Sequence, residues 1–490
     1  MMRWLLALVL AAAPAQAQRF QDLSDTLPAH SYVGWWEHFV GGGVAAFDCN
    51  ADALPELLAA GGDAPMLFLR NQGQMRFVPG AFPVIDHALG AYPLDIDGDG
   101  FLDLFILRAG PDMILQGGPD CQFTDVSASW GLPAEDRWTT AFTAWWDGDR
   151  PTLAIGHYVD RANPAGPFGT CDDNLLLVPE GAGWRPEALS PGFCTLSMLA
   201  ARDSRDRLTL RLSNDRHYYI RGGHEQMWDI AERRFLTEAD GWPRVSLWGM
   251  GIASRDLNGD GRDEVMLTSM ADQLLQIAQP DGTYAAAPYA MGTYATTPHD
   301  GSDGRPSTGW HAEFADIDND GRADLFIAKG NVDQMPTNAI HDPNDLLMQQ
   351  PDGTFAQRAT EAGVATRERS RGAVLADLDG DGRIDLVVVN RRAPLEMYRN
   401  VTEGVGHWLA VDLRQPGGNT RAIGARVTVT AGGHSQMRQV TVGGGHAGGQ
   451  ALPLHFGLGS ATGADVRVDW PDGSVSRVTT PANQVLTLTR

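Results

Sequence analysis

The sequence predicts an all-β protein: a seven-bladed β-propeller over residues 18–404, followed by a small β-sandwich domain over residues 405–490. Three observations lead to this fold class. An acidic turn preceded by an apolar strand recurs along the chain, each copy is followed by further strands, and the C-terminal residues have a different, alternating pattern. Self-similarity at such a spacing is typical of repeat proteins, in which neighbouring units bury one another's apolar faces.

The acidic turn marks the end of the first strand of each repeat. Sequences such as GGVAAFD, LGAYPLD and RGAVLAD place small and apolar residues directly before an aspartate. Two weaker copies, FTAWWD and LSMLAARD, fill the gap between the clear ones. Successive copies lie 47 to 61 residues apart, which suits a four-stranded blade with its loops, and they end at Asp48, Asp95, Asp147, Asp203, Asp256, Asp316 and Asp377.

Each copy continues with the same order of elements. An apolar second strand follows the acidic turn, for example at 104–107 and 386–389. A third strand is expected at 65–71, 112–118, 173–179, 215–221, 272–278, 344–350 and 394–400. The fourth strand begins at an aromatic residue after a polar turn, namely at Phe77, Phe123, Trp184, Phe235, Tyr284 and Phe355.

Six fourth strands serve seven repeats, and the missing strand has a counterpart at the other end of the chain. Residues 18–24 carry Phe20 at the aromatic position, so they are expected to complete the last blade. Such a pairing closes the array into a ring and leaves only short, protected strand edges. An open β-solenoid would leave this mismatch between the two ends unexplained.

Composition limits the partners of the protein. The chain has 490 residues, with 38 Lys and Arg against 61 Asp and Glu, and a formal charge of −23. This charge argues against nucleic acid and anionic membranes as partners, because both would need a basic face. Lys329 is the single lysine, which leaves one candidate for lysine-based chemistry.

The N-terminus has the three parts of a secretory signal peptide. Arg3 precedes an apolar run at 4–13, and residues 15–17 supply small side chains for cleavage before Gln18. The run is shorter than the roughly 20 residues of a membrane-spanning helix. Residues 1–17 are therefore predicted to direct export, and the mature protein is expected to be periplasmic or secreted, without membrane insertion.

Four cysteines in an exported chain are expected to form two disulfides, with three connectivities to choose from. In a propeller blade, the first-to-second and third-to-fourth turns emerge on one face, and the other connections emerge on the opposite face. Cys49 and Cys121 then share one face, while Cys171 and Cys194 share the other. This placement favours the pairs Cys49–Cys121 and Cys171–Cys194.

The four most regular acidic turns have the ligand spacing of a calcium site. Oxygen ligands at positions 1, 3, 5 and 9, a carbonyl at position 7 and glycine at position 6 suit a cation of this size. Position 12 is apolar in every copy, so the turns lie in β-hairpins and lack the bidentate glutamate of an EF-hand. The predicted ligands are Asp95, Asp97, Asp99, Phe101 and Asp103; Asp256, Asn258, Asp260, Arg262 and Glu264; Asp316, Asp318, Asp320, Arg322 and Asp324; and Asp377, Asp379, Asp381, Arg383 and Asp385.

A fifth turn is a further candidate calcium site. It keeps all four side-chain ligands, which are Asp48, Asn50, Asp52 and Glu56, but it has Ala53 in place of glycine. The turns around Asp147 and Asp203 are degraded. The first is too short for a full set of ligands, and Arg205 occupies a ligand position in the second. No calcium is expected in these two blades.

These motifs resemble known sequence families. The pattern D-x-[DN]-x-D-G-x-x-[DE]-L within blade-length repeats is similar to the FG-GAP/VCBS repeats of integrin-α-like propellers. Segments 419–427, 443–446, 455–459 and 468–473 resemble the signature segments of the ASPIC/UnbV domain. Together they resemble the organisation of the cartilage acidic protein family, which implies an extracellular or periplasmic calcium-binding propeller with no established catalytic activity.

Residues 405–490 also have the pattern of a module of their own. Apolar and polar residues alternate, as in half-buried antiparallel strands, at 407–413, 425–431, 437–443, 464–470 and 484–490. The sequence Trp470-Pro471-Asp472-Gly473 is expected to form a hairpin turn whose tryptophan has a structural role. A small β-sandwich packed on the propeller is predicted.

No catalytic residue is assigned. The sequence contains neither G-x-S-x-G nor H-E-x-x-H, and its thirteen histidines lack the spacing of a transition-metal site. A site on the propeller axis would be lined by Trp310, His311, Glu313 and residues 214–216. Buried, hydrogen-bonded roles are favoured for these residues.

Three functional interpretations follow. The favoured one is a non-enzymatic binding or adhesion scaffold in which Ca²⁺ fixes the blades and loops engage an extracellular or periplasmic protein or glycan. An alternative is a hydrolase or lyase that acts on polysaccharide or phosphoester substrates in the central pocket. A third is a purely structural cell-surface element. Ionisable residues with perturbed titration in a concave axial pocket would favour the enzyme.

Overall fold

The computed structural model describes residues 18–163, 169–181, 183–215, 222–270, 272–294, 307–332 and 339–490. The predicted signal peptide, residues 1–17, lies outside the described residues. The described chain is all-β, as predicted. Apart from strands, it contains the helical turn α1 (Ala359–Ala362) and the 3-10 turns η1 (Ser24–Thr26), η2 (Trp36–His38), η3 (Pro119–Cys121), η4 (Glu238–Asp240) and η5 (Tyr289–Met291).

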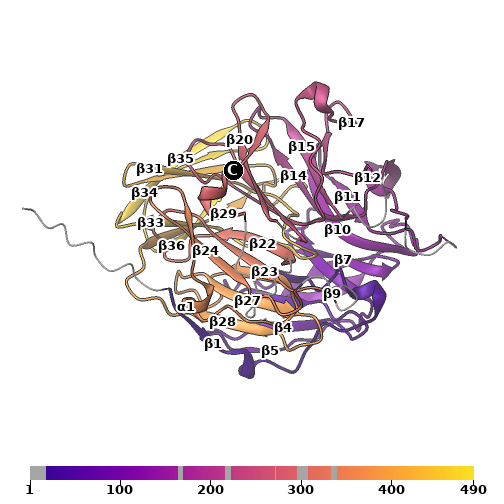
Figure 1. The fold of residues 1–490 in the computed structure, drawn as a ribbon, viewed down its shortest axis with the longest axis horizontal. Helices are drawn as coiled ribbons and strands as arrows, with labels where there is room; N and C mark the ends of the chain where they lie inside the picture. The colour runs from indigo at the N-terminus through magenta and orange to yellow at the C-terminus, as the bar shows by residue number, and fades with distance from the viewer. Residues whose placement is uncertain are drawn as a thin grey trace, which may run out of the picture.

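Most strands form antiparallel groups of four that follow one another along the chain (Figure 1). The first group is β2 (Val44–Phe47), β3 (Glu56–Ala59), β4 (Leu67–Asn71) and β5 (Phe77–Pro79). The second is β6 (Ala88–Leu94), β7 (Asp103–Gly110), β8 (Met113–Gly118) and β9 (Gln122–Asp125). The third is β10 (Arg137–Trp146), β11 (Pro151–His157), β12 (Asn174–Glu180) and β13 (Gly183–Leu189), and β10 also pairs with β7.

The later groups repeat this order. They are β14 (Thr195–Arg202), β15 (Leu208–Asn214), β16 (Gln226–Asp229) and β17 (Arg234–Phe235); β18 (Gly249–Arg255), β19 (Glu264–Ser269), β20 (Leu274–Ala278) and β21 (Tyr284–Ala286); and β22 (Gly309–Ala315), β23 (Asp324–Lys329), β24 (Asp345–Gln349) and β25 (Phe355–Gln357). The last group contains β26 (Ser370–Ala376), β27 (Asp385–Asn390) and β28 (Glu396–Asn400).

The first and last groups meet and close the array into a ring. Strand β1 (Phe20–Asp22) pairs antiparallel with β28, with Phe20 opposite Asn400, so the N-terminal strand completes the last group. The first strand of each group contacts the first strand of the next, and β26 contacts β2. This is the arrangement of a β-propeller, and the pairing of β1 is the contact that the missing fourth strand predicts.

The third strand of the fourth group differs from the prediction. The sequence pattern placed it at 215–221, of which residues 216–221 lie outside the described residues. In the structure, β16 (226–229) pairs with both β15 and β17 and takes this place. The pattern was misleading because DRHYYIR and EQMWD are both short apolar runs, and only pairing decides between them.

The C-terminal domain, residues 405–490, forms two packed sheets. Its strands are β29 (His407–Arg414), β30 (Arg426–Ala431), β31 (His434–Gln439), β32 (Gln450–Ala451), β33 (Leu454–Gly459), β34 (Gly463–Asp469), β35 (Val475–Pro481) and β36 (Gln484–Thr489). One sheet has the order β33-β29-β36 and the other β31-β30-β34-β35. Between them Trp470 is buried, with its Nε1 donating to Ser476 Oγ at 2.9 Å, which is the structural role predicted for it.

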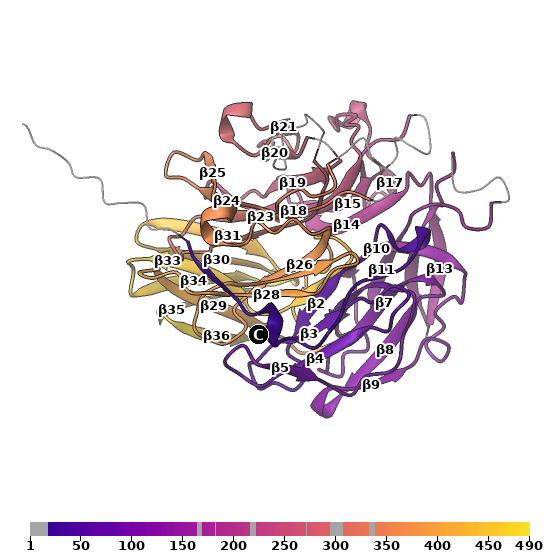
Figure 2. The ribbon, with the colours of Figure 1, turned by 60° about the horizontal axis from the view of Figure 1, so that its bottom comes forward.

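The C-terminal domain lies on one side of the molecule, where its yellow strands occupy the same side in Figures 1 and 2. It is not simply stacked on the propeller. Strand β32 joins the first group by pairing in parallel with β2. The strand predicted at 437–443 ends at Gln439, because the chain beyond it turns into the centre of the ring.

Both predicted disulfides are present, Cys49–Cys121 and Cys171–Cys194. Their sulfur atoms lie on connections that the propeller geometry places on the same face in each case. Within the described residues, no helix is long and apolar enough to cross a membrane.

Candidate functional site

The predicted ligand loops connect the first and second strands of their groups. In the loop 95–103, between β6 and β7, the backbone folds around the carboxylate of Asp95. Its oxygens accept hydrogen bonds from the amides of Gly98 at 2.8 Å and Gly100 at 2.9 Å. At position 9, the carboxylate of Asp103 accepts hydrogen bonds from the backbone amides of Ile96 and Gly117, each at 2.8 Å. The loop therefore holds its first and last carboxylates in fixed positions.

The loops 256–264, 316–324 and 377–385 repeat this scheme, and with 95–103 they are called the regular acidic loops here. In each of the three, the first aspartate accepts the amide of the position-6 glycine at 2.8 or 2.9 Å. The left-handed backbone needed for this bond favours glycine. The φ angles at position 6 are 94°, 80°, 92° and 83° for Gly100, Gly261, Gly321 and Gly382.

Three of the regular acidic loops bring three carboxylates together. One oxygen from each lies within 4.8 Å of the others in the groups Asp95, Asp97, Asp99; Asp316, Asp318, Asp320; and Asp377, Asp379, Asp385. Asp318 Oδ1 is buried and accepts no hydrogen bond from a described residue. Convergent carboxylate oxygens are the donors that hard divalent cations prefer. In the fourth loop, Asn258 stands in place of one carboxylate.

Burial and mutual repulsion raise the pKa values of these carboxyl groups. Burial, with nearby aspartates adding to it, raises the pKa of Asp103 to about 8 and that of Glu264 to about 7. The pKa of Asp377 rises to about 6 for the same reasons. The pKa values of Asp324 and Asp385 lie well above the ordinary range of aspartate, again chiefly because of burial. A bound cation would favour the ionised forms.

Arginine side chains offset part of the charge of these loops. Arg399 of β28 lies 2.7 Å from Asp379 and 3.4 Å from Asp381. The arginines at position 7, whose backbone carbonyls are the predicted ligands, also turn their side chains to position 5, in the pairs Arg262–Asp260, Arg322–Asp320 and Arg383–Asp381. Phe101 holds position 7 in the first loop and is exposed.

The fifth candidate loop differs in its internal bonding. Ala53 adopts a φ of 65°, the left-handed conformation that glycine supplies elsewhere. Asn50 donates to Asp52 at 2.8 Å, so two predicted ligands bond each other. Glu56 is buried beside the Cys49–Cys121 disulfide, and burial raises its pKa to about 7.

In the degraded loop at 203, an arginine faces the first aspartate. Arg207 places its guanidinium Nη2 and Nε at 2.6 and 2.9 Å from Asp203 Oδ2. The backbone amide of Arg205 donates to the other oxygen of Asp203 at 2.9 Å. In this degraded loop the first aspartate is thus bonded by an arginine side chain, whereas in the regular acidic loops it accepts hydrogen bonds from backbone amides.

The C-terminal domain contacts the face that carries the acidic loops. Backbone and side-chain bonds tie it to each of the four regular loops: Thr420 to Asp95, Gln439 to Asp263, Gly406 to Asp318, and His455 to Gly382. Arg426 also lies 2.8 Å from Asp206 of the degraded loop. The sequence pattern predicted that the C-terminal domain packs on the propeller, but it gave no indication that the contact would occur through the acidic loops.

A loop of the C-terminal domain fills the centre of the propeller. In this hub loop, residues 442–449, the amide of Gly444 donates to β14 and that of Gly445 to β18, each at 2.7 Å. The amide of Gly449 donates to β6 at 3.1 Å, and that of His446 donates to His311 of β22 at 3.2 Å. The hub loop thus bonds to first strands from around the ring.

The residues predicted to line the axis have buried structural roles. Trp310 donates to the carbonyl of Gly330, and its ring lies 5.1 Å from that of His446. His311 and Glu313 lie 3.2 Å apart, and Glu313 also accepts a bond from Gln450 at 2.7 Å. Of residues 214–216, Asn214 and Asp215 are buried and hydrogen-bonded, while Arg216 lies outside the described residues.

Comparison with known families agrees with these features. A family described as ASPIC and UnbV matches residues 415–490. A family described as FG-GAP-like repeat matches residues 48–106 and 256–327. The chain is therefore a β-propeller with FG-GAP-like repeats joined to an ASPIC/UnbV domain, as the sequence resemblance indicated.

The chain is a distant relative of the cartilage acidic proteins. Cartilage acidic protein 1 of Mus musculus is 26% identical over 235 residues, which are 46% of this chain and 34% of that protein. The Homo sapiens protein is 29% identical over 167 residues, 33% of this chain and 24% of that protein. The matches span about a third or less of these relatives.

Solved structures with similar backbones have low sequence identity. The complex of BBS1N with ARL6DN aligns with a TM-score of 0.48 at 10% identity, covering 79% of this chain and 99% of that chain. The extracellular domain of a hybrid two component system from B. thetaiotaomicron aligns with a TM-score of 0.42 at 7% identity, covering 97% and 59%.

Proposed function

We propose that the protein is an exported, calcium-stabilised propeller that serves as a non-enzymatic binding scaffold for a protein or glycan. The observation that carries this proposal is the convergence of three carboxylates in each of three hairpin loops of one design. Such loops repel themselves without a cation, by about 4 kcal/mol for each pair of charges 4 Å apart at an effective dielectric near 20. The two disulfides support export, because disulfides persist in oxidising compartments.

The residues present fit an ion of calcium size. Side-chain oxygens at positions 1, 3, 5 and 9 and the carbonyl at position 7 would supply its ligands. Asp318 Oδ1 is buried and has no hydrogen-bond partner among the described residues, so it can offer an oxygen to the ion. When bound, calcium would neutralise the loops. Because the C-terminal domain bonds to these same loops, each ion would also stabilise the joint between the two parts.

The proposed partner surface lies on the face opposite the acidic loops, because the C-terminal domain already packs against the face that carries them. The opposite face is formed by second-to-third turns and by links between blades. Trp35 belongs to this face and is 74% exposed. Arg392 lies over its ring at 6.0 Å. An exposed aromatic beside a cation is a common anchor for protein and glycan ligands.

The alternative of an enzyme with a central pocket has less support. The hub loop occupies the ring centre, where it forms β-bridges with the first strands of several groups. The axial residues Trp310, His311 and Glu313 use their polar atoms in bonds within the protein. A substrate in the hub would have to displace this loop.

The proposal is tested by calorimetry and partner screening of the mature protein. Calcium titration should give four bound ions per chain, or five if the 48–56 loop also binds, and EGTA should lower the unfolding temperature sharply. Glycan-array and pull-down screens in calcium should identify a ligand whose binding is lost on Trp35→Ala. An unfolding temperature that is the same in calcium and in excess chelator would refute the calcium part of the proposal.

A further inference from the structure

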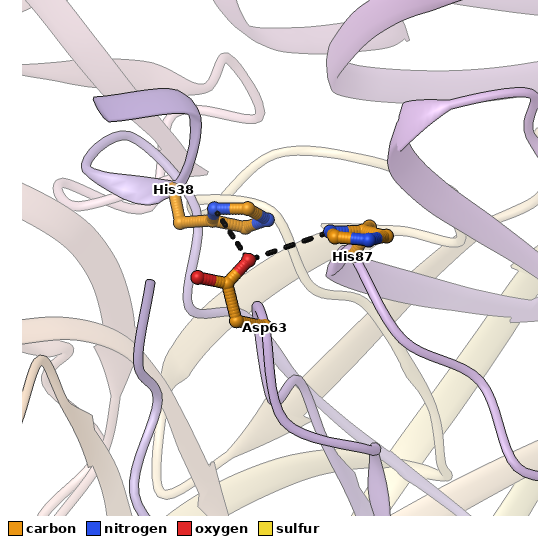
Figure 3. A group of neighbouring side chains, drawn as sticks. All are labelled: His38, Asp63 and His87. Atoms are coloured by element: carbon orange, nitrogen blue, oxygen red, sulfur yellow. Dashed lines mark ion pairs between the residues drawn. The ribbon is translucent and has the colours of Figure 1, made fainter. Parts of the chain in front are cut away.

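Three side chains that lie far apart in the sequence meet on the face opposite the acidic loops (Figure 3). His38 belongs to η2, Asp63 to the turn between β3 and β4, and His87 to the link that precedes β6. Both imidazole rings present Nδ1 to the same carboxylate oxygen, Asp63 Oδ1. One ligand atom from each residue lies within 4.8 Å of the other two.

The distances in this cluster suit coordination better than hydrogen bonding. Nδ1 of His38 and Nδ1 of His87 each lie 3.4 Å from Asp63 Oδ1. Hydrogen bonds from N–H to O are shorter, at about 2.7–3.2 Å. Two ligands that are each about 2.0–2.1 Å from a tetrahedral zinc ion lie roughly 3.3–3.4 Å from one another. The spacing is therefore that of two edges of a zinc coordination tetrahedron.

His38 is held in place and lacks another partner. Its side chain is buried, and neither ring nitrogen has a hydrogen-bond partner among the described residues. Gly34 packs against the ring so closely that a Cβ at this position would lie 2.6 Å from it. Buried polar groups without partners are rare and require an explanation.

The cluster is open on one side. The side chains of Asp63 and His87 are 46% and 47% exposed, so solvent reaches two of the three ligands. Three protein ligands with an accessible fourth position are the arrangement of open zinc sites. Two guanidinium groups, of Arg161 and Arg391, lie near His38. Arg161 is paired with carboxylates, at 3.2 Å from Glu37 and 3.5 Å from Asp136.

We propose that His38, Asp63 and His87 form a binding site for a divalent transition-metal ion, Zn²⁺, with its fourth position open to water or to a ligand group of a partner. Imidazole nitrogens favour zinc, whereas the oxygen donors of the acidic loops favour calcium. The two faces of the propeller thus select different ions. The zinc ion would join η2, the β3–β4 turn and the link before β6 beside the exposed Trp35.

The site is tested on the whole mature protein in excess calcium, so that the acidic loops are occupied. Zinc is titrated by calorimetry, and cobalt is added separately as a spectroscopic probe. One zinc ion per chain is expected, together with the intense visible absorption of tetrahedral cobalt. Asp63→Asn and His87→Asn should each weaken zinc binding at least about ten-fold, a loss that even outer-shell substitutions produce.

The variants are chosen to preserve the fold. His87 has a φ of 54°, and asparagine tolerates this left-handed conformation better than most residues. His434→Ala removes an exposed histidine of a distant hairpin and should leave zinc affinity unchanged. Zinc-free unfolding temperatures of all variants should match the parent protein. Unaltered zinc affinity in both ligand variants, or cobalt spectra without tetrahedral bands, would overturn the proposal.

Discussion

Asp379 links the acidic loop of the last blade to the third strand of the same blade. One of its oxygens lies within 4.8 Å of an oxygen of Asp377 and of Asp385, and another contact, at 2.7 Å, is with Arg399 of the strand paired with β1. A cation at this loop would therefore act close to the point where the ring closes. The same side chain is a predicted calcium ligand at position 3, so it provides a direct test at the scale of a residue.

Asp379→Ala, which removes the position-3 oxygen that asparagine supplies in the 256–264 loop, should remove one calcium ion and lower stability in calcium. A site with a dissociation constant of about 10⁻⁴ to 10⁻³ M contributes about 1.4–2.7 kcal/mol at about 10 mM calcium, by mass action. Calorimetry should count one ion fewer, and the unfolding temperature in calcium should fall. Asp25→Asn, at an exposed aspartate outside the loops, should change neither quantity. Equal calcium counts in both variants would contradict the assignment.

The raised pKa values predict an unusual pH dependence of the calcium-free protein. Asp103, Glu264 and Asp377 bind protons more tightly when folded, with pKa values near 8, 7 and 6. Between about pH 4 and pH 8 the folded state therefore holds more protons than the unfolded state, and stability falls as pH rises. In EGTA, the unfolding temperature should be higher at pH 5 than at pH 8. Saturating calcium should reduce this difference, and an EGTA profile that rises with pH would contradict it.

At the scale of elements, the hub loop packs closely against the first strands of the propeller. Gly448 lies against β2 with so little space that a Cβ would come 2.3 Å from the carbonyl oxygen of Val44 and 2.8 Å from its nitrogen. Glycines in both segments, Gly43 next to Val44 and Gly448 in the hub loop, permit the two backbones to approach this closely. The glycines of this segment are thus needed for packing around the axis.

Gly448→Ala should destabilise the protein by about 1–3 kcal/mol, the usual effect of overpacking a filled interior. The matched control is Gly148→Ala, because a Cβ at Gly148 would meet nothing within 4 Å. Thermal unfolding in calcium measures both variants. If Gly148→Ala lowered the unfolding temperature as much as Gly448→Ala, the close contact of the hub loop would not be the cause of the lost stability.

Most strands of the propeller could be predicted from the sequence because each blade repeats the same local pattern. The ring closure could also be predicted, since the missing strand and Phe20 complement each other. The hub loop could not, because a glycine run such as 443–445 has no periodicity and its contacts are made with β14, β18 and other distant strands. The only hint in the sequence was the pair of glycine runs, at 41–43 before β2 and at 443–445 in the hub loop.

The candidate sites differ in the same way. The carboxylates of the acidic loops lie within nine residues of one another, so their spacing is visible in the sequence. His38, Asp63 and His87 come from three separate connections and meet only through blade packing. For this reason the histidine spacing gave no indication of a metal site. The contacts of the C-terminal domain with the acidic loops could not be predicted from the sequence either, because they join residues far apart in the chain.

At the scale of the whole molecule, calcium loss should loosen the C-terminal domain. The domain bonds to all four regular acidic loops, so repulsion within them would weaken the joint. Hydrogen–deuterium exchange should rise in EGTA for peptides covering 406–420 and 455–459. Peptides from β11, in a blade with no regular acidic loop, serve as the control. Equal exchange with and without calcium at 455–459 would contradict this prediction.

Because β1 completes the last blade and residues 442–449 occupy the ring centre, the propeller depends on segments that lie on both sides of its blades in the sequence. A growing chain cannot assemble the finished ring until β28 has been made, and the middle is filled later still. The inner edges of the early blades therefore stay unpaired until the rest of the chain has been synthesised. Truncation before residue 442 is expected to yield a hollow, aggregation-prone product rather than a smaller working propeller.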